Sequence, residues 1–117
     1  MIAESGVHNA LVIDLVGEDP QLNAFVLYMF EPREWEPSPE RFEQLRAKVN
    51  SYLFHVTDGQ LARQYPESLG KPLRFELRCL HTPDEQTLAY IAALQERLRG
   101  HGIKLVVTVS NLLSPGH

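Results

Sequence analysis

Acidic residues near the two N-terminal apolar runs form the sharpest catalytic pattern in the chain. Asp14 lies within the first run, and Glu31 and Arg33 follow the second. Metal-dependent nucleases place carboxylates on neighbouring strands to hold Mg²⁺, with a cation that stabilises the reacting phosphate. Here Pro32 interrupts the triplet, and arginine replaces a lysine whose pKa such a site can shift. A small metal-dependent hydrolase or nuclease that uses Asp14 and Glu31 is therefore the alternative hypothesis. The non-catalytic interpretation is that Asp14 is solvated at a strand end or paired with Arg33.

Other catalytic and cofactor patterns are missing from the sequence. The five histidines are scattered, with no two at helical i,i+4 spacing and no cysteine at ligand spacing from them. Cys79 is the single cysteine, which excludes an intrachain disulfide. The chain has neither a nucleophile elbow nor a glycine-rich phosphate loop. We expect Cys79 to point inward from a strand as an inert small hydrophobe. These patterns predict no catalytic residue, no metal site and no cofactor.

Two groups of polar and aromatic side chains are better suited to binding. The first is Glu31, Arg33 and Trp35, since tryptophan and arginine are enriched in interface hot spots. Its alternative is a rigid loop with Trp35 tucked under the following helix. The second group lies near the end of that helix and comprises Asp58, Gln60, Arg63 and Tyr65. It suits a peptide or small ligand, and equally a helix terminus with a solvated face.

Composition limits the class of protein. The chain has 117 residues, is 44% hydrophobic and 22% charged, and carries a formal net charge of -4, as expected of one globular domain. The negative charge argues against binding along a nucleic-acid backbone. The N-terminus lacks the pattern of a signal peptide, and no apolar run approaches the ~20 residues of a membrane helix. We therefore expect a cytoplasmic protein without nucleic-acid or membrane partners.

The first half of the chain predicts a hairpin and a helix. Residues 10–16 and 24–30 are apolar on both faces, and the polar segment 17–23 joins them as a turn. Ser38-Pro39 marks a helix start, and Asp58-Gly59 interrupts or bends that helix, which continues to Tyr65. Its apolar stripe is Phe42, Leu45, Val49, Leu53 and Val56.

The second half predicts a strand, a helix and a strand. Residues 73–80 alternate, so that Arg74, Glu76 and Arg78 form a wet face. A capping box at 82–85 starts the second helix, and Gly100 and Gly102 end it. Its stripe is Leu88, Ile91, Ala92, Gln95 and Leu98, and the last strand is 103–109, with Ile103, Leu105, Val107 and Val109 inward.

These elements predict an α+β fold of order β-β-α-β-α-β. We expect one domain over residues 1–117, with an N-terminal arm at 1–9 and a tail at 111–117. The last β-α-β unit should be a right-handed crossover with parallel strands. Both helices should pack on one face of a four-stranded mixed sheet. The order of the strands in the sheet stays open.

Two helices on one face leave the other face of the sheet to be covered. Because the first two strands are apolar on both sides, one of two sets should lie uncovered. The first set is Val12, Val16, Val26, Tyr28 and Phe30; the second is Leu11, Ile13, Leu15, Phe25, Leu27 and Met29. A patch of that kind marks an interface. We predict coverage by a second copy or by a partner protein; the alternative is coverage by the arm or the tail.

A series of short motifs resembles a family of small bacterial proteins known as a domain of unknown function. The motifs are I-D-L (13–15), E-P-R-x-W (31–35), Q-L-x-x-K-x-N-x-Y-L (44–53), D-G-Q-L-A (58–62), Y-P (65–66) and G-K-P (70–72). The resemblance implies a free-standing bacterial cytoplasmic protein and no particular activity. Together with the predicted patch, it favours a non-catalytic interaction module that acts as a homodimer or as the binding partner or inhibitor of another bacterial protein.

Overall fold

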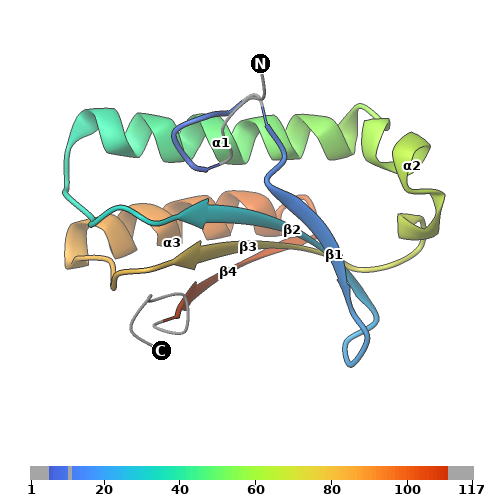
Figure 1. Ribbon diagram of the computed structural model, residues 1–117. Helices are drawn as coiled ribbons and strands as arrows, with labels where there is room; N and C mark the ends of the chain where they lie inside the picture. Colours follow the sequence, from blue (N-terminus) through green and yellow to red (C-terminus); the bar gives the residue numbers. More distant parts are fainter. Residues whose placement is uncertain (1–5, 11, 111–117) are drawn as a thin grey trace, which may run out of the picture.

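A single four-stranded mixed sheet organises the molecule (Figure 1). The computed structural model describes residues 6–10 and 12–110. Its strands are β1 (Leu15–Asp19), β2 (Ala24–Glu31), β3 (Leu73–Cys79) and β4 (Ile103–Val109), which lie in the order β1-β2-β3-β4. β1 runs antiparallel to β2, whereas β2, β3 and β4 are mutually parallel. The predicted order β-β-α-β-α-β is confirmed.

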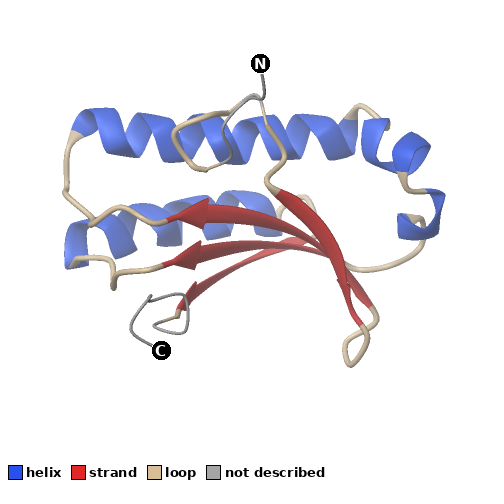
Figure 2. Ribbon diagram, viewed as in Figure 1, coloured by secondary structure: helices blue, strands red, loops and turns tan. Residues whose placement is uncertain are grey.

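The helices connect the parallel strands (Figure 2). α1 (Pro39–Thr57), the short α2 (Gln60–Gln64) and a 3-10 turn (Pro66–Ser68) link β2 to β3, and α3 (Glu85–Arg99) links β3 to β4. The hydroxyl of Ser38 caps α1 by accepting a bond from the amide of Arg41. Gly59 adopts a left-handed conformation with φ of 82°, so the chain breaks there into two helices rather than bending. No helix in the described part of the chain is both long and apolar enough to cross a membrane.

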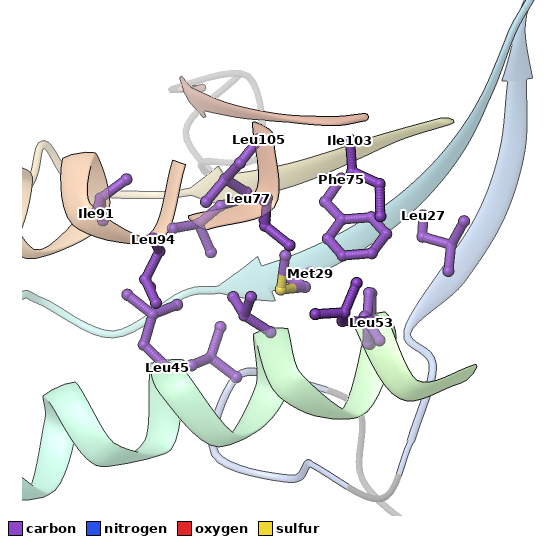
Figure 3. Close-up of a cluster of buried hydrophobic side chains, with 14 of the residues drawn as sticks. Leu27, Met29, Leu45, Leu53, Phe75, Leu77, Ile91, Leu94, Ile103 and Leu105 are labelled. Carbon is purple, nitrogen blue, oxygen red and sulfur yellow. The ribbon is translucent and has the colours of Figure 1, made fainter. Parts of the chain in front are cut away.

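The core lies between the sheet and its two long helices (Figure 3). Alternate residues of β2, β3 and β4 point into it, among them Leu27, Phe75 and Leu105. α1 contributes Leu45, Val49 and Leu53, and α3 contributes Ile91, Leu94 and Leu98. Since both helices meet the same set of strand residues, they cover one face of the sheet, as predicted.

The first strand differs from its prediction. β1 spans residues 15–19 instead of 10–16, and the turn is confined to residues 20–23, with Asp19 paired opposite Ala24. The carboxylate of Asp19 accepts bonds from the amides of Gln21 and Leu22, which stabilises this tight connection. The tight turn sets the register, so the apolar residues that precede Leu15 leave the sheet.

The N-terminal segment is a packed part of the fold and not a free arm. Val7 is buried in the main core, and its amide donates to the carbonyl of Phe30. Residues 1–5 of the predicted arm and the whole predicted tail, 111–117, lie outside the described residues.

The start and the buried stripe of α3 also differ from prediction. The N-cap is Asp84 and not Thr82, because the Asp84 carboxylate accepts bonds from both the amide and the hydroxyl of Thr87. These bonds hold the pKa of Asp84 below its ordinary value. The residues that face the core are Thr87, Ile91, Leu94 and Leu98, whereas Leu88 and Ala92 are exposed. The predicted buried stripe of this helix was therefore displaced around the helix axis from the stripe that faces the core.

Candidate functional site

The face of the sheet opposite the helices carries no described element. On β2 this open face consists of Ala24, Val26, Tyr28 and Phe30; on β3 it consists of Arg74, Glu76 and Arg78; on β4 it consists of Lys104, Val106 and Thr108. The predicted wet face of β3 is therefore confirmed in its orientation. Glu76, however, is largely buried there, between Arg74 and Arg78.

The predicted interface residues do not form one surface. Tyr28 and Val26 lie on the open face, but Val26 is fully buried. Val16 pairs with Leu27 and packs on the helix side, because the shifted register reverses the orientation of the first strand. Val12 precedes β1, and its carbonyl accepts a bond from Lys48. Of that predicted set, Tyr28 and Phe30 remain as candidate contact residues on the open face. Of the second predicted set, Phe25, Leu27 and Met29 point into the core, and Leu11 lies outside the described residues.

Ion pairs run across the open face. Arg74 pairs with Asp19 at 3.0 Å and with Glu76 at 3.6 Å, and Arg78 donates from Nε to Glu76 at 2.7 Å. The side chain of Glu76 is 8% exposed and that of Arg78 is 43% exposed. Lys104, on the neighbouring strand, is exposed too. Glu76 is therefore largely covered, Asp19 is 23% exposed, and the most exposed charged residues of this face are Arg78 and Lys104.

An aromatic and cationic cluster occupies one end of this face. The rings of Tyr28 and Phe30 stack with centroids 6.4 Å apart, and the Arg78 guanidinium lies 4.6 Å above the Tyr28 ring. Beside the cluster is a cavity of about 200 Å³ lined by Phe30, Glu31, Pro32, Arg78 and Leu80. An apolar cavity next to an exposed arginine and a half-buried tyrosine is typical of a protein-binding hot spot.

Glu31 forms the floor of an adjoining polar corner. Its carboxylate accepts a two-pronged bond from the Arg33 side chain, at 2.9 and 2.6 Å, and a further bond from Arg41 at 3.3 Å. The Glu31 carboxylate raises the pKa of Arg33. Arg33 also donates to Gln44 of α1 at 2.9 Å. The predicted recognition corner is therefore a satisfied network that fastens the β2–α1 loop.

Trp35 is held in a packed loop, which agrees with the rigid-loop alternative for this group. Its indole N–H donates to the carbonyl of His81 at 3.1 Å, and the Arg41 guanidinium lies 5.5 Å from its ring centroid. Trp35 packs against the main core, next to Cys79. Burial raises the pKa of the Cys79 thiol to about 12, as expected of an inert cysteine.

Asp14 occupies a second and separate buried cluster. Its carboxylate pairs with Lys48 of α1 at 2.8 Å, and both side chains are 0% exposed. The same carboxylate accepts bonds from the amides of Gly6 and Phe30. Burial lowers the pKa of Lys48, and the hydrogen bond and charge of Asp14 oppose that effect. Asp14 is thus neither solvated nor paired with Arg33, because a lysine distant in sequence reaches it.

Tyr52 completes the Asp14 cluster. Its hydroxyl accepts from the Asp14 amide at 2.9 Å and donates to the carbonyl of Tyr28 at 2.6 Å. Burial raises the pKa of Tyr52 well above its ordinary value. Sequence reasoning missed Arg41, Lys48 and Tyr52. They recur with Leu45 at i, i+4, i+7 and i+11, so they share the helical stripe that buries Leu45.

The two carboxylates of the nuclease hypothesis are already occupied. Asp14 binds Lys48 and two amides, while Glu31 binds two arginines and the amide of Arg33. Within residues 6–10 and 12–110, no three acidic, cysteine or histidine side chains are grouped so as to hold a metal ion. The geometry therefore gives the metal-dependent alternative no support.

The second predicted binding group is divided between surface and core. Asp58 accepts a bond from Gln60 at 3.0 Å and lies 3.8 Å from Arg63, and all these contacts are exposed. Tyr65 instead packs its ring 5.6 Å from that of Phe25 at the margin of the core. The group behaves as a helix terminus with a solvated face.

Comparison with family models matches residues 5–111 to a family of unknown function, DUF6572, and the chain belongs to that family. Nothing matches the chain among curated proteins or among solved structures.

Proposed function

We propose that this member of the family is a non-catalytic protein-interaction module, and that its contact surface is the open face of the sheet around Tyr28, Phe30 and Arg78. The observation that carries the proposal is the cluster itself: stacked aromatic rings under an exposed guanidinium, beside an apolar cavity of about 200 Å³. Arginine and aromatic residues supply much of the energy in protein interfaces.

The occupant we favour is a different protein that presents an apolar anchor beside carboxylates. The cavity has room for one anchoring side chain, and Arg78 at its rim is exposed while its own partner, Glu76, is covered. A second copy laid on the same face would bring Arg78 and Lys104 against equally cationic surroundings. Association in the cytoplasm of a bacterium, as an inhibitor or regulatory subunit, belongs to this proposal.

The test first isolates a binding partner and then compares its affinity for two variants in which an exposed arginine is replaced by glutamate. Proteins captured from cells of the source organism are purified and titrated calorimetrically against the wild type, Arg78→Glu and Arg46→Glu. Arg46 is an exposed arginine of α1 that also pairs with a glutamate. We expect Arg78→Glu to weaken the binary complex at least about tenfold, because it removes the cation at the rim, and Arg46→Glu to leave it unchanged. Equal affinities for the two variants, or a complex that forms elsewhere, would refute the open face as the contact surface.

A further inference from the structure

The outer edge of β4 presents backbone groups in a defined pattern. The amide of Ser110 donates to Cys79 of β3, whereas the Leu105 carbonyl accepts a bond from Gln95 of α3. Because successive residues of a strand point their backbone groups to opposite sides, Ile103, Leu105, Val107 and Val109 direct theirs away from β3. Within the described residues β4 is the last strand of the sheet, so this edge offers hydrogen bonds to a further strand.

β4 is complementary to an antiparallel copy of itself. With Val106 opposite Val106, Ile103 lies opposite Val109, Leu105 opposite Val107, and Lys104 opposite Thr108. The residues whose backbone groups point away from β3 then form the hydrogen-bonded pairs, as an antiparallel ladder requires. Lys104 is the only charged residue of the strand, so no two like charges face each other directly across the pair.

The side of α3 above this edge is self-complementary as well. Gln95 reaches the Leu105 carbonyl, and Arg99 lines a cavity with residues 102–105, so this side of the helix follows the edge. The same stripe includes Glu85 in the first turn and the exposed Leu88 and Ala92. In an antiparallel copy, Glu85 of one helix approaches Arg99 of the other, and the small side chain of Ala92 lies at the centre. Charges and helix dipoles are then both complementary.

The two centres of symmetry coincide. Gln95 meets β4 at Leu105, and Ala92 lies three residues towards the start of α3, about 4.5 Å along the helix axis. α3 runs antiparallel to β4, and 4.5 Å corresponds to about 1.4 residues of a strand. Ala92 therefore lies near the level of Val106, and a single two-fold axis perpendicular to the sheet serves both the strands and the helices.

We propose that two copies of the chain associate through antiparallel pairing of their β4 edges, with their α3 helices side by side. A cavity of about 520 Å³ lies beside the first residues of β4 and the end of α3. In this arrangement it receives the far end of β4 of the other copy, including the exposed Val109. Gln95 releases the Leu105 carbonyl to the incoming strand. Both open faces lie on the same side of the resulting sheet, so the dimer presents two copies of the Tyr28, Phe30 and Arg78 cluster. The association does not depend on what binds that cluster.

Sedimentation velocity over a range of concentrations tests the proposal with two alanine substitutions in α3. Ala92→Glu places two carboxylates at the two-fold axis, and Ala93→Glu makes the same change at an exposed position on the other side of the helix. We expect a wild-type dimer whose dissociation constant rises at least tenfold in Ala92→Glu and is unchanged in Ala93→Glu. Equal effects of the two variants, or a wild type that remains monomeric at about 1 mM, overturn the proposal.

Hydrogen exchange identifies the surface that is buried. The amides of Val107 and Val109 should gain protection as the concentration of wild-type chain rises, while Arg78→Glu should dimerise normally. If the wild-type dimer exchanges the amides of Val107 and Val109 as fast as the monomer, and if Arg78→Glu abolishes that dimer, the contact lies on the open face and the β4 pairing is overturned. A monomeric wild type that dimerises only when shortened to Ser110 assigns the edge to the chain's own C-terminal residues and likewise overturns it.

Discussion

The backbone groups that the sheet leaves unpaired are satisfied differently on β2, where it extends past β1, and at the outer edge of β4. Beyond the end of β1, the amide of Phe30 donates to the Asp14 carboxylate and its carbonyl accepts from Val7, so the N-terminal segment seals this side of β2. At the outer side of β4, the Leu105 carbonyl accepts from the side-chain amide of Gln95. The free edge of β2 is closed by a segment that a buried ion pair holds, whereas the Leu105 carbonyl of β4 is bonded only by a side chain that can be displaced. The chain is thus built to keep β2 closed and leaves β4 able to accept a strand.

The N-terminal segment that closes this side of β2 depends on a buried pair of opposite charges. Asp14 and Lys48 are wholly buried, and the lysine amine also donates to the carbonyls of Asn9 and Val12. Desolvating both charges is costly, so the pair itself is no large source of stability, whereas removing one member leaves the other buried without a counter-ion. The contrast between the two sides of the sheet is therefore best tested by unpairing Asp14.

The largest expected effect is that of Lys48→Met, which keeps an unbranched side chain one heavy atom shorter and leaves Asp14 buried and unpaired. We expect the free energy of unfolding in urea to fall by about 3–5 kcal/mol. Lys71→Met, which breaks the partly exposed pair with Glu18, is the control and should cost less than about 1 kcal/mol. The double variant Asp14→Asn/Lys48→Met should recover part of the loss. Similar losses for Lys48→Met and Lys71→Met would show that the N-terminal segment is not held by this ion pair.

The seal also shows where sequence reasoning succeeds and where it fails. The alternation in residues 73–80, the cap at Ser38 and the β-α-β order at the end of the chain are local signals, and the fold class follows from them. The position of Asp14 depends on Lys48, 34 residues away, and no local pattern reports such a contact. The run around Asp14 suggested a strand from residue 10, whereas the carbonyl of Val12 accepts a bond from Lys48 of α1 and the strand begins at Leu15.

The face that each residue occupies was harder to predict than the element that contains it. The turn after Asp19 is shorter than expected, and because side chains alternate along a strand, the changed register moved Val16 to the helix side. In α3 the N-cap is Asp84 and not Thr82, and the helix buries Thr87 and Leu94 while Leu88 and Ala92 face solvent. Glu31 and Trp35 were found as a group from their spacing. Their partner Arg41 was missed because arginine on an apolar stripe is normally taken as exposed.

A smaller effect is expected from Tyr52→Phe. The change removes a hydroxyl that bridges the Asp14 amide and the Tyr28 carbonyl but keeps the ring, which packs edge-on against Phe75. Leaving a buried donor and acceptor unpaired should cost about 1–3 kcal/mol in urea unfolding, and the Asp14 amide should exchange faster. Tyr90→Phe, at a ring stacked on Phe42 between the helices, is the matched control. An unchanged exchange rate at Asp14 in Tyr52→Phe would mean that the hydroxyl does not take part in the seal.

Gln95→Ala should have the smallest effect on stability and distinguishes the β4 edge most directly from the β2 seal. The Leu105 carbonyl that loses its bond can be solvated, and alanine favours the helix, so we expect a loss of at most about 0.5–1 kcal/mol in urea unfolding at concentrations where the chain is monomeric. Because Gln95 competes with an incoming strand for the same carbonyl, its removal should strengthen self-association in sedimentation. Weaker association would mean that Gln95 contributes to the contact instead of competing for the Leu105 carbonyl, and a loss as large as that of Tyr52→Phe would mean that Gln95 closes the β4 edge as firmly as the Asp14 cluster closes β2. The two sides of the sheet would then be equivalent.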